Sequence, residues 1–193
     1  DVEEPVGNMI IDIGGGTTGI TVIALAGIVC DQSIRIAGDE FTADIMEALR
    51  RYHSLLIGER TSEQIKIQVG AAMKDIDNPP DDFAVNGRDL VTGIPKQIMV
   101  SYQEIAEALD KSIFKIEEAI LKALEQTPPE LAADIYRRGL YITGGGALLR
   151  GLDKRLSQKI KLPVHVADDP LKSVVRGTGI ALKNYDRYPF VMR

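Results

Sequence analysis

Two runs of three consecutive glycines constrain the fold of this chain more than any other feature of its sequence. Gly14-Gly15-Gly16 follows the apolar segment 9–13, and Gly144-Gly145-Gly146 follows the apolar segment 140–142. An apolar, β-branched segment that runs into glycines is typical of a strand ending in a tight turn, because glycine adopts backbone conformations that are closed to other residues. The chain is therefore expected to carry two bare backbone segments at strand ends.

The remaining hydrophobic pattern predicts an α/β fold. Apolar, β-branched segments are expected to form strands, the first three as an antiparallel meander, at residues 9–13, 17–25, 28–36, 96–100, 140–142 and 164–167. A period of three to four, which in the first helix aligns Phe41, Ile45, Leu49 and Tyr52, predicts helices at residues 39–52, 61–72, 101–124, 128–138, up to 160, and 173–185. The capping-box pairs Thr61 with Gln64 and Ser101 with Glu104 mark two helix starts, and Asn86-Gly87 predicts a hairpin turn.

Composition and charge narrow the classes of function. The net charge is −5 and the 23 Lys and Arg are scattered, so the sequence offers no basic stripe for nucleic acid. The single cysteine, Cys30, excludes an intramolecular disulfide and is expected to be a buried thiol in a reducing cytoplasm. The longest apolar run, 20–30, is 11 residues, short of the roughly 20 that a membrane helix needs, so we expect a soluble protein. A start at Asp1 without Met or signal segment indicates a piece of a longer protein.

The segment around the first glycine run has the composition of an anion-binding turn. Glycines let backbone N–H groups converge on a phosphate, and threonine hydroxyls add donors, at Gly14, Gly15, Gly16, Thr17 and Thr18. Asp12, just before them, is a candidate to hold a metal-bound water. The alternative is a hairpin turn whose glycines serve chain conformation alone. The spacing of Gly14, Gly16 and Gly19 matches a dinucleotide fingerprint, but that fingerprint needs a following helix and residues 20–23 are strand-like, which disfavours a dehydrogenase.

The second glycine run leads from a strand into a helix, which would let a flat ring approach Gly144, Gly145, Gly146 and Ala147. A plain strand-to-helix turn is the alternative. Glu63 and Lys66 lie three apart on one helix face, where they could bracket a ribose and an adenine edge or form a solvated ion pair. His53 and His165 have no ligand-spaced partners and are expected to be structural or exposed.

At these residues the chain resembles the actin, heat-shock chaperone ATPase and sugar kinase superfamily, and within it the MreB family of bacterial actin-like, rod-shape-determining proteins. Residues 12–18 resemble the family's second phosphate loop, and residues 143–149 its adenosine motif. Glu63-Gln64-Ile65-Lys66 is similar to its nucleotide-contacting helix. The likeness covers nearly the whole chain. One departure is Gly19, where family members commonly carry Glu.

The resemblance implies an actin-like (ribonuclease-H-like) lobe with a mixed five-stranded sheet flanked by helices. Residues 1–37 and 101–193 would form the core subdomain, and residues 38–100 a small inserted α/β subdomain. The N-terminal lobe would be missing, and with it the first phosphate loop, the water-positioning residue and the membrane-binding segment. No catalytic residue is expected in this chain, which should bind ATP weakly and not hydrolyse it, because hydrolysis needs groups on both sides of the γ-phosphate.

For the intact protein the resemblance implies a filament-forming ATPase that uses ATP and Mg²⁺ and organises cell-wall synthesis and rod shape in bacteria. Its expected place is the cytoplasm, as filaments at the inner face of the cell membrane. Its expected partners are other filament subunits and the membrane adaptor proteins of cell elongation. A small-molecule kinase or a chaperone-type ATPase of the same superfamily is the alternative, and a lobe that serves mainly as an interaction surface is a third possibility.

Overall fold

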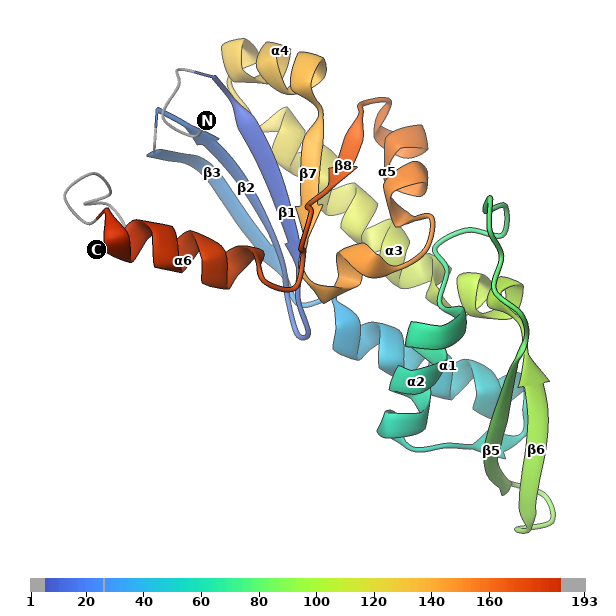
Figure 1. Cartoon of the computed structure of the whole chain (residues 1–193). Helices are drawn as coiled ribbons and strands as arrows, with labels where there is room; N and C mark the ends of the chain where they lie inside the picture. The colour runs from blue at the N-terminus through green and yellow to red at the C-terminus, as the bar shows by residue number, and fades with distance from the viewer. Residues whose placement is uncertain (1–5, 26, 185–193) are drawn as a thin grey trace.

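The computed structural model describes residues 6–25 and 27–184, and its larger sheet is the predicted mixed one (Figure 1). This five-stranded sheet has the order β3-β2-β1-β7-β8. Its strands are β1 (Asn8–Ile13), β2 (Thr18–Ala24), β3 (Gly27–Ile34), β7 (Leu140–Thr143) and β8 (Val164–Val166). The first three form the predicted antiparallel meander, while β7 pairs in parallel with both β1 and β8.

The meander forms because its strands alternate buried and partly exposed side chains. In β1 the side chains of Met9, Ile11 and Ile13 are all completely buried, and in β2 those of Ile20 and Val22 are buried with them. Period-two burial of this kind matches a sheet with one face on the core. Cys30 lies on the edge strand β3 and is only partly buried, so the expectation of a buried thiol was wrong.

Three helices pack on this sheet. The longest, α3 (Tyr102–Glu125), packs on β2 and β3, while α4 (Pro129–Arg138) contacts β1 and α5 (Leu152–Ile160) contacts β8. The last described helix is α6 (Ser173–Lys183). The predicted start of α3 is confirmed, since the Ser101 hydroxyl accepts a hydrogen bond from the Glu104 amide. Its apolar stripe, Ile105 to Ile120, is completely buried. By contrast, no residue of α6 is buried, and its predicted end at Tyr185 lies outside the described residues.

A second, three-stranded sheet and two helices form the lower right part of the molecule in Figure 1. Its elements are α1 (Gly38–His53), β4 (Leu55–Leu56), α2 (Glu59–Val69), β5 (Phe83–Asp89) and β6 (Pro95–Val100). The hydrophobic core is continuous with the first part, because Phe41 and Ile45 of α1 join the same buried cluster as Ile113 of α3. The boundaries predicted for the insert, 38–100, stay a prediction.

The hairpin of this second sheet does not turn where the sequence predicted. Strand β5 runs straight through Asn86-Gly87, and the chain reverses after Asp89, with Gly93 at φ +76°. Gly87 is needed for packing instead: a Cβ there would lie 2.7 Å from Leu55 Cγ. The Asp89 carboxylate closes the turn by accepting from the Thr92 and Val91 amides at 2.9 Å each. These bonds and Lys96 lower the pKa of Asp89 to about 2.

Other helix boundaries also differ from the prediction. Helix α2 begins at Glu59 after Gly58, so Thr61 and Gln64 lie inside the helix and form no capping box. Tyr52 at the end of α1 is half exposed rather than on the buried face. The helix expected up to Ile160 is divided into a short 3₁₀ turn, η1 (Gly145–Leu148), and α5, because Gly151 takes the left-handed conformation between them.

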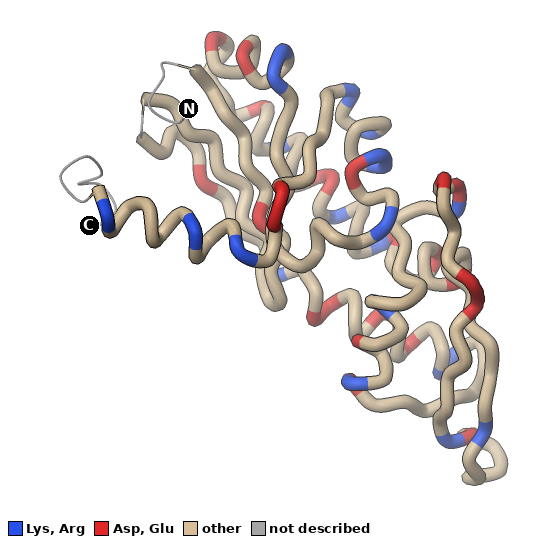
Figure 2. The backbone as a smooth tube through the Cα atoms, viewed as in Figure 1, with Lys and Arg blue, Asp and Glu red and all other residues tan. Residues whose placement is uncertain are grey.

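The charged residues and the two histidines lie where the sequence analysis led us to expect. Lys and Arg are interspersed with Asp and Glu and gather into no single basic stripe in the part of the chain that is described (Figure 2). His53 is partly buried and contacts the Glu104 carboxylate at 2.6 Å, while His165 is exposed and packs on Tyr141, in line with the expectation that both are structural or exposed. Within residues 6–25 and 27–184 no helix is long and apolar enough to cross a membrane.

Candidate functional site

Each glycine run follows a strand, as the sequence predicted, and the two runs lie together at one end of the sheet's strands. Strands β1 and β7 are parallel neighbours, and Asp12 pairs with Thr143 directly before the two runs begin. Since parallel strands end at the same edge of a sheet, the two runs emerge together. They line one cavity of about 620 Å³, to which the first run contributes Gly14 and Gly15 and the second contributes Gly145 and Gly146.

The first glycine run is neither strained nor crowded. None of its three residues takes the left-handed backbone conformation, and a Cβ on Gly15 or Gly16 would meet nothing nearer than the Asp39 carboxylate, at 3.7 and 3.6 Å. Among the described residues, neither the Gly15 nor the Gly16 amide has a protein acceptor. Chain conformation alone therefore does not require these glycines, and their exposed N–H groups are available to an anion.

The start of α1 holds this turn in place. The Gly38 amide donates to the Gly14 carbonyl at 3.1 Å, and the Asp39 amide donates to the Gly15 carbonyl at 2.8 Å. These two bonds use carbonyl groups of the turn and do not involve the Gly15 and Gly16 amides. Sequence reasoning missed Gly38 and Asp39 as site residues, although a glycine at the point where the strand period changes to the helix period was the available signal.

The second glycine run has mainly structural reasons for its composition. Gly144 has φ +81°, and a Cβ on it would lie 2.4 Å from the Ile13 carbonyl oxygen. A Cβ on Gly146 would lie 2.2 Å from Ile13 Cγ2. The run therefore packs directly on the end of β1, which brings η1 beside the first turn. Gly145 meets only Leu171, at 3.4 Å, and is exposed at the cavity.

Helix α2 supplies a charged wall of the cavity. Lys66 Nζ lies 2.6 Å from the Glu63 carboxylate and donates to the Gly38 carbonyl at 2.8 Å and to Thr42 Oγ1 at 3.1 Å. The Thr42 hydroxyl in turn donates to Glu63 at 3.0 Å. The Lys66 side chain is only 15% exposed, so this pair is not the freely solvated one that the sequence left open. These bonds hold the Lys66 ammonium group, with Glu63 as its counter-ion, at Gly38, whose amide binds the first turn.

Several predicted residues lie away from the cavity. Thr18 is completely buried and donates to the Ile36 carbonyl at 2.6 Å, so its hydroxyl is already used inside the protein. Ile65 and Ala147 are buried in the core, and Gln64 lies on an exposed side of α2.

Three further predicted residues do not line the cavity. Gly16 and Thr17 are exposed, and Gly144 is partly buried against Ile13. Leu148 and Leu149, the end of the predicted adenosine motif, do line the cavity. It is completed by residues that were not predicted: Gly38, Asp39, Phe41, Ile67 and Leu171.

Asp12 lies close to the second glycine run rather than in the cavity lining. Its Oδ1 would be 2.5 Å from a Cβ placed on Gly144. The described residues contain no group of three or more His, Cys, Asp or Glu side chains that could hold a metal ion. A single carboxylate with water ligands is nevertheless how Mg²⁺ is commonly held beside a nucleotide, since that ion keeps much of its water shell.

The fold and the cavity together define an actin-like lobe: a mixed sheet that starts as a meander, with a cavity at the strand ends between two glycine-containing turns. A family model described as MreB/Mbl protein matches residues 1–189. The chain belongs to this MreB/Mbl family.

Relatives from two bacteria support the assignment. The chain is 48% identical over 189 residues to the cell shape-determining protein Mbl of Bacillus subtilis, which covers 98% of this chain and 56% of that protein. It is 46% identical over 190 residues to the cell shape-determining protein MreB of Escherichia coli, covering 97% of this chain and 53% of that protein. The chain therefore spans about half the length of these relatives.

Solved structures agree with this fold. A crystal structure of MreB 5 of Spiroplasma citri bound to AMPPNP matches with a TM-score of 0.92 and 40% identity, covering 97% of this chain and 56% of that one. A MamK double helical filament matches with a TM-score of 0.68 and 25% identity, covering 85% of this chain and 50% of that one. The predicted family and actin-like fold are confirmed.

Proposed function

We propose that this lobe forms one side of an ATP site, with the phosphates on the first glycine turn and the adenosine beside η1. The supporting observation is that the Gly15 and Gly16 amides have no acceptor among the described residues and are uncrowded, and that Gly15 lines a cavity shared with the second glycine run. A volume of about 620 Å³ is within the usual range for small-ligand sites. The relative from Spiroplasma citri, whose structure holds AMPPNP, makes an adenine nucleotide the first ligand to test.

Each part of the cavity suits one part of the nucleotide. Free amides bind phosphate oxygens, and Lys66 adds a fixed positive charge beside them. The Glu63 carboxylate is half exposed and can accept hydrogen bonds from ribose hydroxyls. Leu148 and Leu149, with the open face of Gly145, offer an apolar surface for the adenine ring. Asp12 would hold a water of the Mg²⁺ ion that accompanies ATP.

For the intact protein we propose an ATP-dependent, filament-forming role in bacterial cell shape. Mbl and MreB, the relatives at 48% and 46% identity, are cell shape-determining proteins, and MamK forms a double helical filament. In this proposal the nucleotide biases the angle between two lobes and so the contact between successive subunits. The filaments would lie at the inner face of the cell membrane with elongation adaptor proteins as partners, and residues 38–100 would act as an inserted subdomain.

The binding proposal is tested by titrating the 193-residue chain with MgATP and following its amides by two-dimensional NMR, which measures weak affinities residue by residue. We expect a saturable shift centred on Gly15, Gly16 and Gly145, with no release of phosphate from ATP. Shifts scattered over the surface, or none, would contradict the proposed site. Steady phosphate release that Gly15→Asp abolishes would contradict the claim that this lobe lacks the catalytic groups.

The filament proposal is tested separately, by electron microscopy of the full-length protein with and without MgATP. Filaments that depend on ATP are expected. A protein that stays discrete and phosphorylates a small molecule would favour the kinase alternative.

A further inference from the structure

The two walls of the cavity are joined to each other just outside it. After α2 ends, the segment 70–72 runs alongside residues 149–151, which follow the second glycine run. Ala71 forms a parallel β-bridge with Arg150, and the Ala72 amide donates to the Arg150 carbonyl at 2.8 Å. Gly70 permits this approach, because a Cβ on it would lie 2.9 Å from Leu149 Cδ1. Backbone contacts therefore link the cavity wall formed by α2 to the wall formed by the second glycine run and η1.

The side chain of Arg150 strengthens this link at the end of α2. Its Nη1 donates to the Ile67 carbonyl at 3.2 Å and to the Gly70 carbonyl at 3.3 Å. The last carbonyls of a helix have no partner within the helix, and a cation is favoured at that end by the helix dipole. Ile67 itself lines the cavity. Arg150 thus binds the same turn of α2 that lines the cavity.

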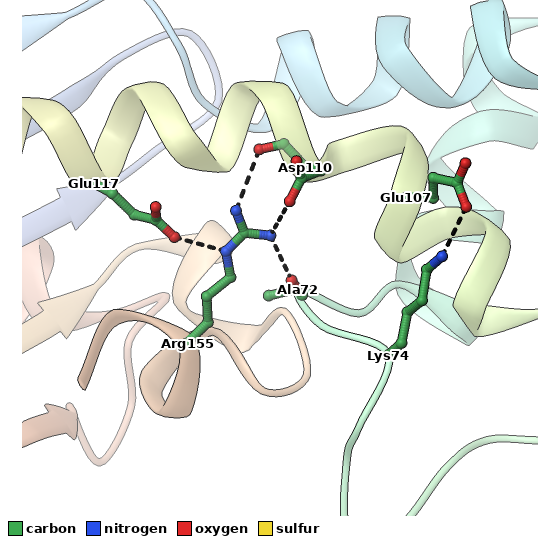
Figure 3. A network of polar contacts seen from close by, with 6 residues as sticks. All are labelled: Ala72, Lys74, Glu107, Asp110, Glu117 and Arg155. Atoms are coloured by element: carbon green, nitrogen blue, oxygen red, sulfur yellow. Dashed lines mark hydrogen bonds and ion pairs between the residues drawn. The ribbon is translucent and has the colours of Figure 1, made fainter. Parts of the chain in front are cut away.

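Arg155 of α5 makes a second connection, which Figure 3 shows. Its Nη1 donates to the Ala72 carbonyl at 2.9 Å and lies 2.8 Å from Asp110 Oδ1, while its Nε donates to the Glu117 carboxylate at 2.6 Å. The side chain of Arg155 is 16% exposed and that of Glu117 only 4%. One guanidinium therefore binds both the segment after α2 and helix α3, and so connects them to its own helix α5.

We propose that Arg155, together with Arg150, is a positioning residue of the ATP site. Neither side chain lines the cavity. Their contacts hold the α2 wall, with Glu63 and Lys66, at a fixed separation from the second glycine run, so that the two walls contact the nucleotide together. The inference rests on the proposed function, because a wall can be positioned for ATP only if ATP binds between the walls.

The variants must remove the connection without leaving a buried charge. Arg155→Met alone would leave the Glu117 carboxylate buried and unpaired, which can unfold a protein. The double variant Arg155→Met with Glu117→Met removes both charges and keeps unbranched side chains of similar length. Arg150→Ala removes only the bonds to the end of α2. The matched control is Lys74→Met, which breaks the exposed Lys74–Glu107 ion pair drawn in the same Figure 3 but no bond between the two walls.

Two measurements test the inference, and only one of them uses ATP. The first is amide exchange of residues 59–72 by NMR. We expect the exchange rate of these amides to increase about tenfold in the double variant and several-fold in Arg150→Ala, which is the effect of losing about one charge-assisted hydrogen bond. The amides of α3 should stay as protected as in the parent. The Lys74→Met control should exchange like the parent. The second is the MgATP titration, in which both variants should bind about tenfold more weakly than the control.

The possible outcomes separate the two proposals. If exchange of residues 59–72 does not change, the arginines do not hold α2 and the inference is wrong. If exchange rises while the parent and the variants bind MgATP equally, the arginines stabilise α2 but position nothing for ATP, and the inference is again wrong. If the parent itself binds no MgATP, the proposed function fails and the positioning role fails with it, while the exchange data still report whether the arginines hold α2.

Discussion

Substitution of selected glycines by alanine, which adds one methyl group, distinguishes a glycine that binds a ligand from one that close packing requires. At Gly15 a Cβ would lie 3.7 Å from Asp39 Oδ1, an ordinary contact, and the backbone is not left-handed. We expect Gly15→Ala to change the free energy of unfolding by less than about 1 kcal/mol. At Gly146 the Cβ would lie 2.2 Å from Ile13 Cγ2, so β1 or η1 must shift. Overpacking of this kind costs about 1–3 kcal/mol.

The effect that each substitution should have on ATP binding does not follow its effect on stability. A methyl group on Gly15 would stand at the cavity where a phosphate approaches the free amides, and losing one charge-assisted hydrogen bond there would weaken binding about tenfold. Gly19→Ala is the control, because nothing lies within 4 Å of a Cβ at that position in β2. It should leave ATP binding unchanged and slightly raise stability, since glycine weakens a strand.

Thermal unfolding by circular dichroism and the MgATP titration give the two readouts. For a chain of this size 1 kcal/mol corresponds to a change of about 2–4 °C in Tm, so Gly146→Ala should unfold about 2–12 °C below the parent. Gly15→Ala should keep its Tm and lose affinity. If Gly15→Ala lowers Tm as much as Gly146→Ala does, the first glycine run serves chain conformation and the main support for the proposed function is gone.

Three further predictions concern the fold. Ser101→Ala removes the hydroxyl that caps α3, so Tm should fall by roughly 2–4 °C, corresponding to about 1 kcal/mol; an unchanged Tm would mean that the cap is not needed. Hydrogen bonds to the Asp89 carboxylate hold its pKa near 2, below its unfolded value, so its contribution to stability is present above about pH 4 and is lost as the pH falls through 2. Protection of the Val91 and Thr92 amides should follow that change, and Asp89→Asn should abolish the pH dependence. Gly87→Ala, which crowds Leu55, should cost about 1–3 kcal/mol in chemical unfolding, whereas Gly177→Ala in the uncrowded α6 should not destabilise the protein.

The parts of the fold that sequence predicted well depend on local pattern. The meander of β1, β2 and β3 and the buried stripe of α3 follow from apolar periodicity, and the residues in them are buried as expected. The hairpin turn was misplaced because Asn86-Gly87 fits a tight turn locally, while Gly87 is required by contact with Leu55, which is 32 positions away in the chain. Asp89 followed by Gly93 was the better turn signal, since an aspartate caps the turn and a glycine supplies the positive φ.

The candidate site also has some features that the sequence predicts and others that it does not. That each glycine run ends a strand could be predicted from the apolar segment before it, whereas the pairing of β1 with β7 was learned from the structure. Which residues of each run face the cavity could not be predicted, because that depends on contacts with Ile13, Pro170 and the start of α1. Thr18 illustrates the difference. Its place in the motif suggests a hydroxyl that donates a hydrogen bond to a phosphate, but the alternation of side chains along β2 turns it into the core, where the hydroxyl donates to the Ile36 carbonyl.

The two glycine runs therefore have the same composition for different physical reasons. Packing on Ile13 fixes Gly144 and Gly146 whether or not a nucleotide is bound, whereas no contact among the described residues requires glycine at positions 15 and 16, where we propose that the phosphates bind. It follows that family members that have lost nucleotide binding should keep glycine at the positions of Gly144 and Gly146 and accept other small residues at those of Gly15 and Gly16. An alignment of such members against nucleotide-binding ones tests this, and equal retention of glycine at all four positions in both groups would show that the first turn has a structural constraint that the contacts around Asp39 do not reveal.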